Sequence, residues 1–477
     1  MRGFGHRPPR GYKMPFTRRR EIGNRSGWSW PDMEYRLLRS AVLFTLLVLP
    51  VFAQYSPLKL SLKQAVDIAL APEGNTRVKL AEEALRQAEA RSDEARSALL
   101  PDLEGAVSEQ NQTRNLKAFG FQFPKIPIPG FTIPTFVGPF DVFDARASVT
   151  QSVFDFSHIR SYQASKVAIE AVRAENQGTR DQVAAQVARA YLTALRAQAT
   201  RETADANVAL SEALLKLAQS QKTAGIGTGI EVTRADVQLA NDRQRLLVAQ
   251  NDVERSHLQL LKVIGLKLDN PVELTAALTY IPVDSMDVAQ ALATARGTRA
   301  ELQAQQHREE SANLSYSAAK SERLPTLGAF ADYGSSGSGI NNSLPTRSYG
   351  VALKIPIFDG GRRDAHRAES ASVYRQEKIR TADLRDQIEL DVRLALENLH
   401  SADAQIKAAE EGLQLAENEL AQAQRRYKAG VAIGIEVTDA QTRLDRARDN
   451  RISALYNYNL ARIDLGAATG TIRGMIQ

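Results

Sequence analysis

The chain has 477 residues, of which 24% are charged, 6% are aromatic and none is cysteine. The lack of cysteine excludes a disulfide scaffold, a thiolate zinc site, an iron–sulfur cluster and a cysteine nucleophile. The formal net charge of +6 arises from residues 1–39, which hold ten basic and three acidic residues, whereas the chain after them is close to neutral. A nucleic-acid-binding function based on a basic surface is therefore excluded.

The first part of the chain has the features of an export signal. The apolar run Ser40–Phe52 follows Arg36 and Arg39 and ends in a small-x-small pattern at Ala53. We therefore expect residues 1–53 to hold a secretory signal peptide with an over-extended N-terminus, the alternative being a membrane anchor. No run of about 18 apolar residues follows, which excludes a helical inner-membrane transporter.

The remaining sequence contains two copies of one long unit. Three short matches recur in the same order, at offsets of 205, 204 and 224 residues: Gly225–Thr233 with Gly430–Thr438, Val153–Asp155 with Ile357–Asp359, and Leu100–Leu103 with Leu324–Leu327. Ordered repeats of this kind indicate a duplicated structural unit. We expect repeat 1 over 54–270, a linker over 271–284 and repeat 2 over 285–477.

Each copy is predicted to contain very long helices. Proline, which interrupts helices, is absent between Pro139 and Pro271 and after Pro356. From Ile388 to Tyr427, apolar and small residues recur at spacings of three and four, which is a heptad seam. We expect two helical hairpins, 157–224 with 230–266 and 361–429 with 435–465, joined by turns at about 225–229 and 430–434. One molecule cannot bury such hairpins in a compact core, so the pattern implies assembly.

Alternation of polar and apolar residues predicts four strands, at about 102–112, 142–154, 326–334 and 348–358. Each is close to the roughly ten residues that a tilted strand needs to cross a bilayer. The alternative is a small soluble sheet with one buried face. Four strands cannot close a barrel, so at least two chains are needed if the sheet lies in lipid.

The extra segment of the first copy, Thr113–Asp141, holds five prolines and six phenylalanines. Proline disfavours a regular helix or a central strand, and so many phenylalanines do not suit a solvated linker. We expect an ordered extracellular loop that packs over the barrel mouth or against a neighbouring chain, with a partner-binding site as the alternative. The corresponding segment of the second copy, Ser335–Ser348, is rich in Gly, Ser and Asn and is predicted to be a mobile loop.

The duplicated order of helix, strand pair and long hairpin, together with two local motifs, resembles the TolC family of outer-membrane efflux proteins. The motifs are a strand–helix junction and a helical turn: Pro356, Ile357, Phe358, Asp359, Gly360 and Gly361, and Tyr427, Lys428, Ala429 and Gly430. The resemblance covers about Leu60–Gly470 and implies a mainly α fold with membrane β-strands. It implies a homotrimer, in which a twelve-stranded β-barrel in the outer membrane joins a twelve-helix tunnel in the periplasm.

The function implied by this resemblance is the passive exit duct of a tripartite export system in a Gram-negative-type envelope. Its partners would be outer-membrane lipid, a periplasmic adaptor (a membrane fusion protein) and an inner-membrane transporter that supplies the energy. The rival hypothesis is a periplasmic coiled-coil adaptor or scaffold without a membrane barrel. An enzyme is disfavoured because the six histidines are scattered, with no HExxH motif or close pair, and we expect no cofactor and no metal site.

Glycines mark both predicted turns, at Gly225, Gly229, Gly430 and Gly434. Glycine permits the positive φ values that a tight helix–helix turn requires, and this is one explanation for them. A phosphate-binding loop would need a preceding strand and a different spacing. By resemblance, these turns form the periplasmic mouth of the tunnel, where adaptor hairpins dock.

Two acidic residues, Glu436 and Asp439, follow the second turn. They lie three residues apart, so they share a helix face, and their position near a helix N-terminus suits the helix dipole. The resemblance implies that such carboxylates form rings around a narrow entrance. Carboxylates brought close together by threefold symmetry would favour bound cations.

The remaining gate residues also follow from the resemblance. Tyr427 corresponds to a family tyrosine that helps to keep the entrance shut. This chain has Ala432 where a basic gating residue is expected, and the first copy offers Arg234 beside Glu231 as a substitute. The alternative is that these residues serve capping and packing alone.

Overall fold

The computed structural model describes residues 58–120, 135–283 and 286–476. The signal peptide expected at 1–53 lies outside the described residues, as do residues 121–134 of the segment rich in proline and phenylalanine.

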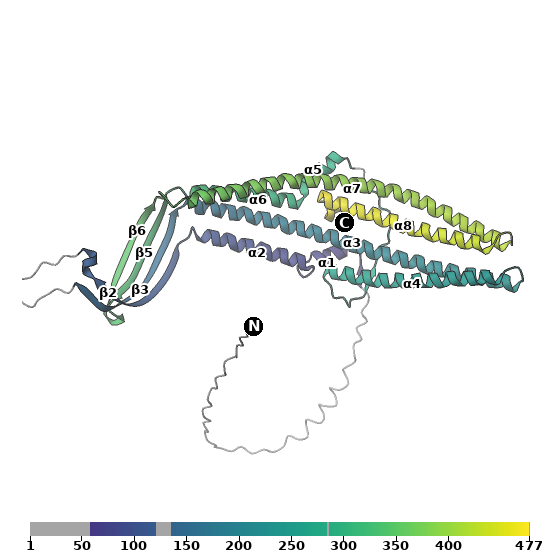
Figure 1. Ribbon diagram of the computed structural model, residues 1–477, viewed down its shortest axis with the longest axis horizontal. Coiled ribbons are helices and arrows are strands. Elements are labelled where there is room, and N and C mark those ends of the chain that lie inside the picture. Colours follow the sequence, from purple (N-terminus) through teal and green to yellow (C-terminus); the bar gives the residue numbers. More distant parts are fainter. Residues whose placement is uncertain (1–57, 121–134, 284–285, 477) are drawn as a thin grey trace, which may run out of the picture. The chain divides into compact units, whose positions relative to one another are not determined.

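The described chain runs twice through a series of one short strand, two helices, two long strands and two long helices (Figure 1). The first series is β1 (Leu58–Leu60), α1 (Leu62–Leu70), α2 (Thr76–Ser97), β2 (Asp102–Asn115), β3 (Phe136–Phe154), α3 (Phe156–Thr223) and α4 (Gly229–Ile264). The second is β4 (Val272–Leu274), α5 (Val288–Thr298), α6 (Ala300–Ser321), β5 (Thr326–Gly337), β6 (Ser343–Lys354), α7 (Arg362–Lys428) and α8 (Gly434–Thr469). Three short helices complete the described elements, η1 (Leu116–Phe119), η2 (Ile340–Asn342) and α9 (Ile472–Met475).

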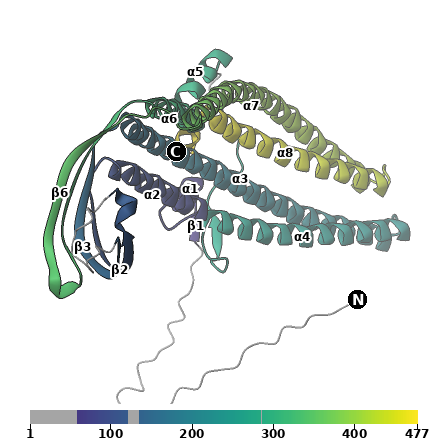
Figure 2. The same cartoon turned by 60° about the vertical axis from the view of Figure 1, so that its left-hand side comes forward.

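The long helices form the two predicted hairpins. α3 has 68 residues and α7 has 67, while α4 and α8 have 36 each. α3 packs against α2 and α4, and α7 packs against α6 and α8. Figures 1 and 2 show the four long strands at one end of these helices and the turns at the other. Among the described residues, no helix combines the length and the apolar character needed to cross a bilayer.

Most of the heptad seam predicted in the second copy is a line of buried side chains along α7, and two of its predicted members, Ala409 and Leu413, are half-buried. Its buried members between the middle of the helix and its end are Ile388, Val392, Ala395, Leu399, Ala402, Ile406, Ala416, Leu420, Ala423 and Tyr427, each at most 9% exposed. The part of the seam from Ile388 to Ile406 packs against α5 and α8. The part from Ala416 to Tyr427 packs against α8 and apolar residues of α3. The burial of this seam holds the second hairpin together and attaches it to the first.

The region predicted as a linker, 271–284, contains the short strand β4. This strand pairs in parallel with β1, so Leu58 lies opposite Val272 and Leu60 opposite Leu274. The linker prediction did not include this strand, whose apolar side chain Leu274 is buried in the same core as Leu60. The pairing joins the beginnings of the two series.

The four long strands form one antiparallel sheet in the order β2-β3-β5-β6. Residues in register show that its two faces differ. One row across all four strands is apolar, Leu103, Val149, Ala331 and Tyr349, and the next row on the opposite face is polar, Glu104, Ser148, Asp332 and Ser348. The polar face also carries Arg146, whose Nη1 lies 3.3 Å from Asp332 Oδ1.

The strand predicted at 348–358 has different bounds in the structure, where β6 runs from Ser343 to Lys354. Pro356 has no N–H to donate to a sheet, which accounts for the early end of the ladder. The apolar side chains beyond it, Ile357 and Phe358, are 94% and 88% exposed. The alternation that continued through Ile357 was therefore a poor guide to the end of the strand.

Two loop predictions also need correction. Ser335–Ser348 is mostly strand, because β5 extends to Gly337 and β6 begins at Ser343, with η2 between them. In the first copy, β3 begins at Phe136 and includes Pro139, although prolines were expected to exclude a strand. Pro139 is tolerated because the β2–β3 register shifts opposite it, between Gln112 and Arg114, and β5 pairs with β3 only from Phe143 onward.

Candidate functional site

The first candidate site is the end of the molecule where both hairpins turn. Gly225 has φ 78° and Gly430 has φ 71°, so these two positions require glycine for the turn itself. Gly229 and Gly434 are the first residues of α4 and α8 and adopt no positive φ. A Cβ added at Gly434 would lie 3.4 Å from Glu231 Oε1, which is an ordinary van der Waals contact, so this position places the second turn against Glu231 without requiring glycine.

Glu231 links the two turns within one chain. Its Oε2 accepts a hydrogen bond from the Thr228 backbone N–H at 3.0 Å, and its Oε1 accepts one from the Gly434 backbone N–H at 3.2 Å. The Thr228 N–H has the largest effect on the pKa of the Glu231 carboxyl and lowers it; burial opposes this, and the Gly434 N–H and the charge of Arg234 add to the lowering. Glu231 is therefore an ionised cap shared by both hairpins.

Tyr427 lies beside this contact, at the end of α7. It is 7% exposed, and its backbone carbonyl accepts a hydrogen bond from Gln221 Nε2 of α3 at 3.1 Å. Burial raises the pKa of the Tyr427 phenol, and the charge of Glu231 adds to the effect. Tyr427, Glu231, Arg234 and Gly434 line one cavity of 30 Å³, so the structure brings these four predicted residues together.

The predicted acidic pair lies on the outside of this contact. Glu436 and Asp439 are both exposed on the first turns of α8. Glu436 Oε2 lies 3.5 Å from Arg426 Nε, which belongs to the last turn of α7. Arg426 therefore places a positive charge beside Glu436 at this end of the molecule. The sequence analysis missed it, although its position directly before Tyr427 was a usable signal.

The predicted strand–helix junction is a helix cap. Asp359 Oδ1 accepts a hydrogen bond from the Gly361 N–H at 3.2 Å, and its Oδ2 accepts one from the Arg363 N–H at 3.1 Å. Gly360 and Gly361 have φ values of 73° and 89°, which glycine adopts without strain. Asp155 has the same role in the first copy, where it accepts from the N–H groups of Ser157 and His158 at 2.8 and 3.2 Å. The repeated Phe-Asp pair therefore begins the long helices, and in this structure its role is structural.

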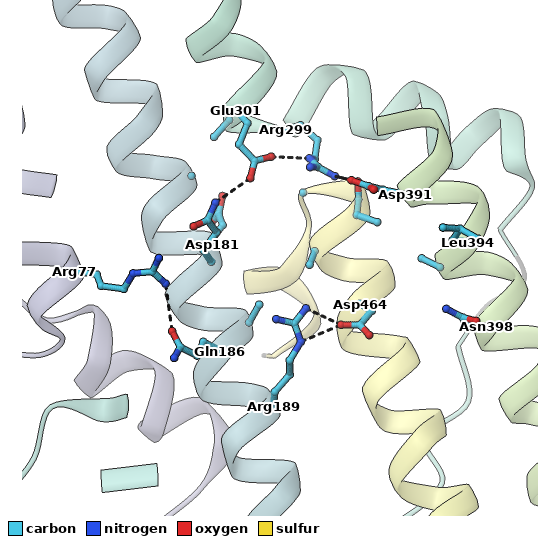
Figure 3. Close-up of a pocket in the computed structure, with 18 residues that line it drawn as sticks. Arg77, Asp181, Gln186, Arg189, Arg299, Glu301, Asp391, Leu394, Asn398 and Asp464 are labelled. Atoms are coloured by element: carbon cyan, nitrogen blue, oxygen red, sulfur yellow. Dashed lines mark hydrogen bonds and ion pairs between the residues drawn. The ribbon is translucent and has the colours of Figure 1, made fainter. Parts of the chain in front are cut away.

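A second site is a charged cavity of 640 Å³ where α2, α3, α6, α7 and α8 meet (Figure 3). Arg299 is central to it, with a side chain that is 12% exposed. Its Nε lies 2.8 Å from Glu301 Oε2, and its Nη1 lies 3.3 Å from Asp391 Oδ2 and 3.1 Å from the Ala468 carbonyl oxygen. Arg189 forms a second pair, with 2.7 Å between its Nη2 and Asp464 Oδ1. In Figure 3, Arg299 lies between Glu301 and Asp391, while Arg77 faces the neutral side chain of Gln186.

The sequence analysis did not predict this cavity, because its residues come from five elements and form no local motif. Among the residues that the structure describes, no group of three or more His, Asp or Glu side chains could hold a metal ion.

Long helical hairpins in two copies, joined to an antiparallel sheet with one apolar and one polar face, fit an outer-membrane channel protein. The chain matches the outer membrane efflux protein family over residues 68–266 and 291–471, and it belongs to that family. The outer membrane efflux protein BepC of Brucella suis is 23% identical over 327 residues, which cover 68% of this chain and 71% of BepC. The outer membrane protein TolC of Escherichia coli is 23% identical over 352 residues, 69% of each chain.

Solved structures share the same fold. The outer membrane protein VceC of Vibrio cholerae superimposes with a TM-score of 0.72 at 20% identity, over 86% of this chain and 96% of VceC. The CmeC outer membrane channel of Campylobacter jejuni gives a TM-score of 0.73 at 16% identity, over 86% of each chain. The protein is therefore an outer-membrane transport protein with a periplasmic extension, and its family consists of channels, which are not enzymes.

Proposed function

We propose that the chain is one subunit of a homotrimeric exit duct, in which three four-stranded sheets close a twelve-stranded barrel and the hairpins form a twelve-helix tunnel. The observation that carries this proposal is the two-faced sheet. Its apolar face is exposed within one chain, with Leu103, Val351 and Tyr349 at 71%, 73% and 81%. Within the described part of the chain, its outer strands β2 and β6 each pair with one neighbouring strand, so both edges are open there. Open edges are not tolerated in lipid, and closure by further copies satisfies them.

The duct itself is passive. The energy for export comes from an inner-membrane transporter, which a periplasmic adaptor links to the duct. The apolar side chains at the turns support an adaptor contact at this end. Ile226, Val431 and Ile433 are 72%, 69% and 63% exposed, beside the turn glycines. A patch of exposed apolar residues at the end of a helical bundle fits a partner with an apolar helical tip. The rival hypothesis made this chain itself a periplasmic adaptor. In the present proposal the adaptor is a separate protein that binds this chain.

The proposal is tested by isolating the full-length protein from outer membranes in mild detergent. We expect a particle with the mass of three chains, which dissociates on heating in SDS and forms ion-conducting channels in planar bilayers. A stable single chain, or a protein that does not fractionate with the outer membrane, would contradict the trimeric duct.

We also propose that the turn end is the gate and that Glu436 and Asp439 form its cation-binding ring. Replacing both, as Glu436→Gln with Asp439→Asn, removes six carboxylates from a trimer, so divalent cations are expected to block the conductance less well. We expect the half-blocking concentration to rise by about tenfold, which corresponds to about 1.4 kcal/mol of binding free energy.

The matched control is the double variant Glu410→Gln with Glu411→Gln, which removes two exposed carboxylates from a more distant part of α7. Conductance in planar bilayers at increasing divalent cation concentration compares the two. Equal block in the Glu436→Gln, Asp439→Asn variant and the wild type would remove these residues from the gate.

A further inference from the structure

A buried polar layer joins the two hairpins in the part of α4 and α8 that lies near the turns. Ser211 of α3, Asp242 of α4 and Gln441 of α8 are each 1% exposed. Ser211 Oγ donates a hydrogen bond to Asp242 Oδ2 at 2.5 Å, and Gln441 Nε2 donates to Ser211 Oγ at 2.6 Å. Gln441 Nε2 also lies 3.4 Å from Asp242 Oδ2. Asp242 is thus a buried carboxylate that receives hydrogen bonds from both hairpins.

Asp445, one helical turn after Gln441, adds a second buried carboxylate to this layer. It is 5% exposed, and neither of its carboxylate oxygens receives a hydrogen bond from the residues that the structure describes. Arg245 Nη1 lies 3.5 Å from Asp242 Oδ1 and 3.5 Å from Asp445 Oδ2, and the Arg245 side chain is 61% exposed. One solvent-facing guanidinium is therefore shared by two buried carboxylates.

The charges around Asp445 and its neighbour Asp449 come from α3, α4 and α8. They are Arg196 on α3, Asp242, Arg245 and Asp252 on α4, and Arg448 and Asp449 on α8. Arg448 is already engaged, because its Nη1 donates a hydrogen bond to Asn207 Oδ1 of α3 at 2.6 Å. Burial, followed by the charge of Asp242, raises the pKa of Asp445 to about 6, against the opposing charges of Arg245 and Arg448.

We propose that Asp445 is the proton-sensitive part of a clasp between the two hairpins of one chain. The clasp is the contact of Ser211, Asp242 and Arg245 in the first hairpin with Gln441 and Asp445 in the second. When Asp445 carries a proton, the layer holds one negative charge, and Arg245 balances it. When the proton leaves to water, two largely buried carboxylates repel each other, and the repulsion is relieved if α8 moves away from α4. A cavity of 460 Å³ lined by Asn207, Asp242, Arg245 and Asp445 gives water access to the group.

The direction of the pH effect follows from the raised pKa. The packed arrangement binds the proton more tightly than an arrangement in which Asp445 is solvated and titrates near its ordinary value of 3.8. Protonation therefore stabilises the packed clasp, and this stabilisation is lost as the pH rises from about 4 to about 6. A difference of about two pKa units corresponds to a shift of about a hundredfold in the ratio of packed to parted hairpins. The clasp lies within one chain and does not depend on the trimer or on an adaptor.

Because the chain has no cysteine, two introduced cysteines can carry spin labels without other changes. We choose Gln250→Cys on α4 and Asn450→Cys on α8, whose side chains are exposed. The labelled full-length protein is produced with an excess of unlabelled chain, so that distances within one chain dominate. Pulsed electron–electron double resonance from about pH 4.5 to about pH 8 is expected to show a narrow distance distribution in acid and a longer or broader one above the transition. An unchanged distribution over this range would overturn the proposal.

Three variants separate the clasp from a general pH effect. Asp445→Asn is expected to keep the narrow distribution at every pH, whereas Asp252→Asn, which removes an acid at the edge of the same cavity, should retain the transition. Arg245→Met should move the transition to higher pH, because the positive charge that favours the ionised carboxylate is lost. A transition in Asp445→Asn at the wild-type pH would also overturn the proposal, and if that variant does not fold, the shift in Arg245→Met decides.

Discussion

Replacing Glu231 with alanine is expected to open the channel at its turn end. The carboxylate accepts hydrogen bonds from the Thr228 and Gly434 N–H groups, at 3.0 and 3.2 Å, and alanine loses both. A hydrogen bond to a charged group contributes about 1.5 kcal/mol or more, so loss of the contact between the hairpins should shift the ratio of closed to open turns by about tenfold in each chain. Conductance of the purified protein in planar bilayers measures the effect, with an increase expected.

The matched control for this variant is Asp236→Asn, which removes an exposed carboxylate from the same helix. It is expected to conduct like the wild type. Because the pKa of Glu231 is lowered below its ordinary value of 4.5, the contact is intact above that pH and is lost only in stronger acid. Equal conductance of Glu231→Ala and the wild type at neutral pH would show that this carboxylate does not hold the gate.

Replacing Arg299 with methionine is expected to destabilise the fold by about 2–3 kcal/mol. The variant leaves Glu301, Asp391 and the Ala468 carbonyl without their guanidinium partner at a largely buried position. Loss of one partner of a fully buried ion pair costs about 3–5 kcal/mol, and we expect less because Glu301 and Asp391 are 37% and 33% exposed. Urea unfolding followed by circular dichroism, at fixed detergent and protein concentrations, measures the change.

Arg296→Met provides the matched comparison for this loss. Arg296 is 61% exposed and its Nη2 lies 3.8 Å from Glu389 Oε2, so its replacement should change the free energy of unfolding by less than about 1 kcal/mol. The two arginines lie three residues apart in the chain but differ in burial. If both variants lose the same stability, the cavity in Figure 3 does not depend on the buried guanidinium.

The long helices and their buried seam could be predicted because the signal is local and repeated. Ile388, Val392 and Ala395 begin a pattern of spacings that only a helix places on one face, and the structure buries all three. The end of β6 could not be predicted in the same way. Alternation continued through Ile357, whereas the backbone pairing stops at Lys354 because Pro356 cannot donate.

The candidate sites were predicted less completely than the fold. Glu231, Arg234, Tyr427 and Gly434 were named from two motifs, and they line one cavity. The partner of Glu436 was missed, because an ion pair between the end of α7 and the start of α8 depends on how the turn orients both ends. Arg299 was missed for a similar reason: its partners Asp391 and Ala468 are distant in sequence and only the folded packing brings them together.

The two long helices arose from one repeated pattern, yet their surroundings differ. α3 is packed against α1, α2, α4, α6, α8 and α9, whereas α7 has its main contacts with α5, α6 and α8. A helix that is packed on many sides is displaced less easily than a helix with fewer neighbours. We therefore expect the first hairpin to be held more firmly than the second, and the second to be displaced at lower cost.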